Sequence, residues 1–95
     1  MQYTISDIKM LVLPILQKHG ATAAGLFGSI VRDEMTEDSD IDILVEIAKD
    51  ISLLDFVGIK LEIEDALGGK VDLVEYDTIK PLIRDRILAE QVVIL

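Results

Sequence analysis

Apolar residues recur at every second position from Ile41 to Ile47, and two carboxylates, Asp40 and Asp42, flank the first of them. A period of two predicts a β-strand with one buried face. Side chains two residues apart in a strand point to the same side, with their Cα atoms roughly 6.5 Å apart. The chain must therefore fold so that one face of this strand is buried. The other face presents two neighbouring acids, between which a divalent cation could bind.

A glycine-serine turn precedes this strand. Gly28-Ser29 follows an apolar run over residues 21–27, which we interpret as a strand, and residues 30–34 predict one or two helical turns. Backbone N–H groups in such a turn can bind a phosphate. The dipeptide alone is a common turn, so its position between a strand and a short helix is the informative feature. Arg32, one turn further on, could point at phosphate oxygens or pair with a nearby acid.

Three further segments space their apolar residues as helices do. The first two open with the capping residues Thr4 and Ser52, and the third opens at Thr78 with Pro81 in its first turn. The predicted helices span residues 4–19, 52–67 and 78–91.

A third strand is predicted from Lys70 to Tyr76, and Asp72 shares a face of it with Val74. Asp72 is the candidate for a third carboxylate of the site, because acids such as Asp55 fall on predicted helices. Its local sequence fits equally well an acid that protects a strand edge from aggregation.

The order of elements predicts the fold class. Residues 1–95 form a single α/β domain with two layers, a small mixed β-sheet and helices packed on one face of it. The opposite face of the sheet is predicted to carry Asp40, Asp42 and Asp72. The apolar residues 92–95 are not assigned to an element.

The charge of the chain restricts its partners. Asp and Glu number 18 against 9 Lys and Arg, for a formal net charge of -9. Nucleic-acid binding generally needs a basic surface, so no direct nucleic-acid ligand is expected. The acidity favours a basic protein partner or serves only solubility. The chain contains no cysteine, which fits a cytoplasmic protein, and no apolar run approaches a membrane span.

The acidic segment itself indicates a magnesium site more than a calcium loop. Magnesium prefers carboxylate and phosphate oxygens, and a third carboxylate could complete a second metal position or accept a proton. An EF-hand beginning at Asp38 would need glycine at its sixth position and glutamate at its twelfth, where this chain has Ile43 and Lys49. A solvated acidic loop remains the other interpretation.

Two separated motifs resemble those of the DNA polymerase beta nucleotidyltransferase superfamily. The resemblance spans about Ile8 to Leu95. Within the superfamily, the chain is most similar to the minimal nucleotidyltransferase branch. Asp33 departs from the pattern, because many relatives have glycine after the arginine, and a left-handed backbone costs more for aspartate. The matching residues are Leu26-Phe27-Gly28-Ser29, Arg32, Glu34, Ser39-Asp40-Ile41-Asp42, and Arg84, Arg86 and Glu90 in the last helix.

The resemblance implies an activity and a partner. It implies transfer of AMP from ATP to a hydroxyl, with two Mg²⁺ ions as cofactors and release of pyrophosphate. Minimal members are commonly encoded as antitoxins beside a HEPN-domain ribonuclease toxin, which some of them inactivate by adenylylating a tyrosine and others neutralise chiefly by binding. The implied nucleotide-binding residues are Gly28, Ser29, Arg32 and Ser39, and the implied catalytic and metal-binding residues are Asp40, Asp42 and Asp72.

Two hypotheses of different classes are compatible with these residues. The first is a protein adenylyltransferase that modifies the toxin. The second is a catalytically vestigial antitoxin that neutralises a basic toxin by binding it through an acidic face and exposed apolar residues such as 92–95. Transfer to a small molecule is a weaker third, because relatives of that kind usually carry an extra substrate domain. The acceptor, nucleotide preference and oligomeric state stay open.

Overall fold

The computed structural model describes residues 3–36, 38–48 and 50–95. Helices and strands alternate along most of the chain, and two single turns of 3-10 helix, η1 (Gly28–Ile30) and η2 (Tyr76–Thr78), follow strands. The other elements are α1 (Ile5–Lys18), β1 (Ala21–Phe27), β2 (Ile41–Ile47), α2 (Leu53–Leu67), β3 (Val71–Glu75), α3 (Pro81–Glu90) and β4 (Val92–Val93).

The four strands form one mixed sheet in the order β3-β2-β1-β4. β2 pairs antiparallel with β1 and parallel with β3, and β4 pairs antiparallel with β1. The predicted mixed sheet is confirmed. The short strand β4 was not predicted, and it changes the interpretation of residues 92–95. Ile94 is buried in the core. Among residues 92–95, Val93 is the large apolar side chain that is exposed, at 65%.

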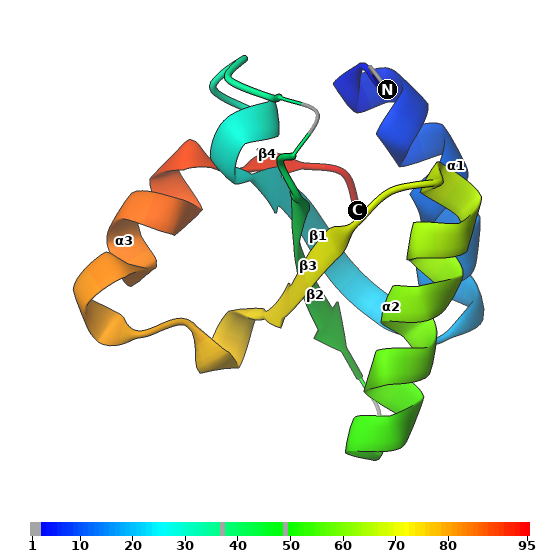
Figure 1. Ribbon diagram of the computed structural model, residues 1–95. Helices are drawn as coiled ribbons and strands as arrows, with labels where there is room; N and C mark the ends of the chain where they lie inside the picture. Colours follow the sequence, from blue (N-terminus) through cyan, green and yellow to red (C-terminus); the bar gives the residue numbers. More distant parts are fainter. Residues whose placement is uncertain (1–2, 37, 49) are drawn as a thin grey trace.

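Helices α1 and α2 cover one face of the sheet (Figure 1). The first helix begins where predicted, because Thr4 and Asp7 form a reciprocal capping box, and Pro14 is accommodated within one continuous helix. Alternate residues of β2 point into this layer, as their period of two predicts. The core consists of Ile8, Val12, Leu16, Ala24, Leu26, Ile41, Ile43, Val45, Ile59, Ile63, Leu67, Val71, Leu73 and Ile94.

The predicted packing on one face holds for α1 and α2, whereas helix α3 lies on the other side of the sheet and has no buried residue (Figure 1). It starts at Pro81, later than predicted, and Thr78 is not its cap. The Thr78 hydroxyl donates instead to the carbonyl of Glu75, 2.9 Å away, within the turn η2. Lys80, in extended conformation, separates this turn from the helix, because a residue before proline disfavours helical geometry.

No helix in the part of the chain that the structure describes is long and apolar enough to span a bilayer.

The register of the sheet determines which acidic side chains become neighbours. Asp42 pairs with Asp72 across the parallel strands and with Phe27 across the antiparallel ones. The face away from α1 and α2 therefore carries both acids next to the end of β1.

Candidate functional site

Two of the three predicted carboxylates are direct neighbours across β2 and β3. Asp42 and Asp72 are register partners in the parallel pair, and adjacent strands lie about 4.8 Å apart. Asp40 immediately precedes β2, two residues before Asp42, so its side chain belongs to the same face. Asp42 is partly buried, whereas Asp40 and Asp72 are exposed. The structure thus brings all three acids to one end of the sheet.

The electrostatics show that these groups act on one another. Burial raises the pKa of Asp42 from 3.8 to about 6, and the charges of Asp72 and Asp40 contribute in the same direction. Glu90 adds to this effect, and only the nearby cation Arg32 opposes it. A carboxyl group held in this way is costly to ionise at neutral pH without a cation.

The donor set suits a hard divalent cation. Asp40, Asp42 and Asp72 offer only carboxylate oxygens, the ligands that Mg²⁺ prefers, and their mutual repulsion is relieved by a positive ion. Among residues 3–36, 38–48 and 50–95, no three acidic or histidine side chains are already gathered tightly enough to hold a metal ion. Binding would therefore include rotation of these side chains toward the ion.

The glycine-serine turn lies directly against this group. Gly28 has a φ of +77°, in the region that favours glycine. A Cβ atom at Gly28 would stand 2.1 Å from Oδ2 of Asp42, closer than any real contact. A side chain at this position would strain the backbone and force the Asp42 carboxylate to move, so the turn lies directly against Asp42. The Ser29 hydroxyl donates to the sulfur of Met35, 3.1 Å away.

Glu90, at the end of α3, lies in the site, although the sequence analysis named it only as a matching residue without a role. Its Oε1 accepts a hydrogen bond from the Gly28 N–H (2.8 Å) and one from Nη1 of Arg32 (2.7 Å). Arg32 also contacts Glu34, with Nε 3.2 Å from Oε2. Two interpretations of Arg32 were left open, a contact with phosphate or pairing with nearby acids. In the structure Arg32 pairs with acids. Glu90 stands 62 residues from Gly28, so only the fold reveals the contact.

Two other predicted positions have different surroundings. Ser39 accepts a hydrogen bond from the Thr36 N–H (3.0 Å) and contacts the Thr36 hydroxyl, so it stabilises the turn before β2. It lines a hollow of about 960 Å³ next to the residues that precede α1, together with Asp33. Asp33 has a φ of +58°, which is the left-handed backbone considered for this position from the sequence.

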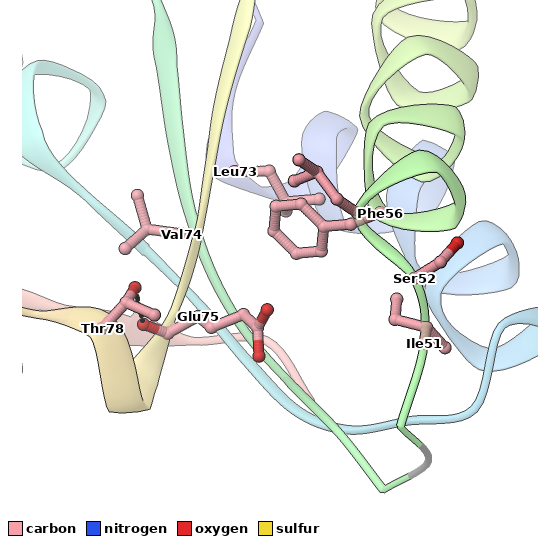
Figure 2. A pocket seen from close by; sticks show the side chains of 8 residues that line it. Ile51, Ser52, Phe56, Leu73, Val74, Glu75 and Thr78 are labelled. Atoms are coloured by element: carbon pink, nitrogen blue, oxygen red, sulfur yellow. Dashed lines mark hydrogen bonds between the residues drawn. The ribbon is translucent and has the colours of Figure 1, made fainter.

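A second pocket lies between the start of α2 and β3 (Figure 2). Its volume is about 430 Å³, and Phe56 and Leu73 form an apolar wall beside which Glu75 extends. None of the predicted site residues, all of which the structure describes, lines this pocket. It is therefore separate from the carboxylate group, although Asp72 is carried by the same strand.

The family of the chain is established by comparison with known proteins. Residues 12–95 match the family model described as polymerase beta, nucleotidyltransferase. The chain belongs to this nucleotidyltransferase family.

Among its relatives is a protein of Methanocaldococcus jannaschii with the provisional name protein adenylyltransferase MJ0435, 52% identical over 96% of this chain and 98% of the relative. Protein adenylyltransferase MntA of Thermococcus cleftensis is 42% identical over 80% of this chain and 77% of its own.

Solved structures show the same fold. A structure described as a minimal nucleotidyltransferase has a TM-score of 0.78 and 38% identity, over 88% of this chain and 86% of that one. A tri-AMPylated HEPN toxin from Shewanella oneidensis in complex with an MNT antitoxin also matches, with a TM-score of 0.73 and 19% identity over 93% and 69% of the two chains. The second likeness concerns the fold alone.

Proposed function

We propose that this chain transfers AMP from ATP to a tyrosine hydroxyl of a HEPN-domain toxin and thereby acts as an antitoxin. The observation that carries the proposal is the contact between the turn and the carboxylates. A turn whose left-handed backbone favours glycine lies against Asp42, and Asp42 is paired with Asp72 across the sheet. A phosphate site and a cation site thus lie within reach of one triphosphate.

The residues of the turn have the binding role. The Gly28 N–H, the Ser29 hydroxyl and the Arg32 guanidinium are donors that can bind the β- and γ-phosphates. Asp40, Asp42 and Asp72 would hold two Mg²⁺ ions. When bound, such ions neutralise phosphate charge and stabilise the attacking and leaving oxygens. Ser39 would contribute only if its turn moved toward the nucleotide.

The reaction itself needs positioning more than covalent participation of the protein. A bond forms between the tyrosine oxygen and the α-phosphorus, while the bond from that phosphorus to the oxygen bridging to the β-phosphate breaks. Pyrophosphate leaves, and the tyrosine proton passes to a carboxylate. Asp72 suits this role because it is exposed and lies on the edge strand β3, where an acceptor can approach.

The acceptor is proposed to be a protein for two reasons. Relatives that match most of this chain are named protein adenylyltransferases, and a structure with this fold holds an AMPylated HEPN toxin. The net charge of -9 also favours encounter with a basic partner. Because the reaction consumes ATP, we place it in the cytoplasm.

The test combines the purified chain, ATP labelled on its α-phosphate, MgCl₂ and a HEPN-domain protein from the same genome. We expect label on a tyrosine of the HEPN protein, located by mass spectrometry. Asp42→Asn should abolish the label, whereas Asp65→Asn, which removes an exposed acid of α2, should not. Equal labelling by wild type and Asp42→Asn would remove Asp42 from the reaction.

The vestigial alternative makes the opposite prediction. Exposed apolar side chains gather on α2, where Leu53, Leu54 and Leu61 are open to solvent, and they could serve binding without chemistry. If binding alone neutralises the toxin, triple replacement of Asp40, Asp42 and Asp72 by Asn leaves neutralisation in cells intact. If AMP transfer is required, the triple variant fails to protect.

A further inference from the structure

The donors of the proposed phosphate site are already occupied by a carboxylate of the chain itself. One oxygen of Glu90 accepts from both the Gly28 N–H, at 2.8 Å, and Arg32, at 2.7 Å. The side chain of Glu90 is only 19% exposed, whereas that of Arg32 is 43% exposed, so Glu90 is the more buried partner of this ion pair. A carboxylate oxygen held by a backbone N–H and a guanidinium has the same partners that a phosphate oxygen would need.

Glu90 is the last residue of α3. The next residue, Gln91, attaches the junction between α3 and β4 to the sheet. Oε1 of Gln91 accepts a hydrogen bond from the Tyr76 hydroxyl, 2.7 Å away. Gln91 lies so close to Gly25 that a Cβ atom there would stand 2.2 Å from it. The junction of α3 and β4 therefore crosses the site face and is attached at two neighbouring points.

The rest of α3 is only loosely attached. It has no buried residue, and Leu82 in its first turn is 98% exposed. Near its middle, Arg84 donates to the carbonyl of Tyr76, 2.8 Å away. A helix that buries so little apolar surface can shift at low cost when one of its terminal contacts is exchanged.

We propose that Glu90 is a built-in competitor of the triphosphate. ATP binds by exchanging its phosphate oxygens for the Glu90 carboxylate on Gly28 and Arg32, and the C-terminal end of α3 is released in the exchange. Until that exchange, the charge of Glu90 adds to those of Asp40, Asp42 and Asp72 and also disfavours entry of an anion. The inference rests on the proposed use of the glycine-serine turn for phosphate.

The decisive experiment is titration calorimetry with ATP and Mg²⁺ in the absence of any acceptor. Glu90→Gln keeps the size of the side chain but removes its charge, and we expect about tenfold tighter binding of ATP, the scale of one charge-assisted hydrogen bond. Inorganic triphosphate should show the same ratio, because Glu90 contacts only the phosphate turn. Asp85→Asn, which removes an exposed charge on the same helix, should change the affinity by less than about twofold.

A purely structural role predicts the reverse sign. If Glu90 serves to hold Arg32 and Gly28 in place for the nucleotide, Glu90→Gln weakens ATP binding, and the proposal is overturned. Unchanged affinity overturns it as well. If neither wild type nor variant binds ATP, both the proposed function and the proposal that Glu90 competes with triphosphate fail. Binding by wild type with no gain in Glu90→Gln removes only the competitor.

A measurement on the wild-type chain guards against a variant that does not fold. Hydrogen exchange of the peptide covering residues 86–93 is followed with and without ATP and Mg²⁺. Release of Glu90 predicts faster exchange in this segment when ATP is bound. Slower or unchanged exchange would show that α3 stays attached, which contradicts the proposal.

Discussion

Replacing Asp42 by Asn should make the metal-free protein more stable at neutral pH, although it removes a proposed catalytic residue. Burial, Asp72 and Asp40 raise the pKa of Asp42 from 3.8 to about 6. A difference of about two pKa units corresponds to about 3 kcal/mol between the charged and neutral forms. Because Asp42 keeps part of its surface in water, screening reduces this to about 1–2 kcal/mol. Asn removes the charge and keeps the shape.

The sign of the effect depends on pH in a defined window. Between pH 3.8 and about 6 the folded wild type binds more protons than the unfolded chain, so its stability falls as pH rises. The Asn variant lacks this carboxyl group, so its stability does not fall with pH for this reason. The gap in stability is therefore near zero below pH 4, opens between pH 4 and 6, and stays constant above about pH 7.

Urea unfolding followed by circular dichroism, in EDTA at pH 4 and pH 7.5, measures the gap. In a thermal scan at pH 7.5, 1 kcal/mol corresponds to a rise in Tm of about 4–8 °C for a domain of this size. Asp65→Asn controls for the general effect of removing one negative charge. Addition of Mg²⁺ should stabilise wild type and leave Asp42→Asn nearly unchanged. An Asn variant that is less stable than wild type at pH 7.5, or equally shifted at both pH values, would refute the electrostatic account of the site.

Three smaller predictions concern the backbone around the site and one helix terminus. Gly28→Ala should lower the free energy of unfolding by at least about 1–2 kcal/mol and abolish ATP binding in calorimetry, because a left-handed backbone and contact with Asp42 both oppose a Cβ atom. Asp33→Gly should raise stability in urea by about 0.5–1 kcal/mol, since φ there is +58°; lower stability would contradict this. Ser52→Ala should cost about 1 kcal/mol in urea and leave AMP transfer unchanged, because the Ser52 hydroxyl caps α2 through the Asp55 N–H.

Local periodicity was sufficient to predict the central part of this fold. The alternation from Ile41 to Ile47 predicted β2, its buried face and the placement of Asp42 on the opposite face, because strand geometry leaves no other choice. Asp72 could be assigned to the same face only as one of two interpretations. Its pairing with Asp42 depends on the register of β2 and β3, which is set by the packing of the whole sheet.

The C-terminal part of the chain could not be predicted in the same way. Helix α3 has no apolar stripe that is buried, so nothing in its sequence indicates which side of the sheet it covers. A strand of two residues, β4, is too short to show a period. The contact of Glu90 with Gly28 follows from both of these features, and pattern reasoning therefore named Glu90 without giving it a role.

Several local departures from ordinary protein structure meet at this one end of the sheet. Asp42 is ionised at neutral pH against its surroundings, Gly28 and Asp33 hold left-handed backbones, and Glu90 places a further negative charge beside existing ones. The crowding of negative charge and the left-handed backbone of Asp33 are unfavourable for folding, and none of these features is required by the core beneath α1 and α2. Such departures persist where they serve a ligand. A cation and a polyphosphate bound together would relieve the repulsion around Asp42, which is the physical reason for the metal–nucleotide complex in the proposed function.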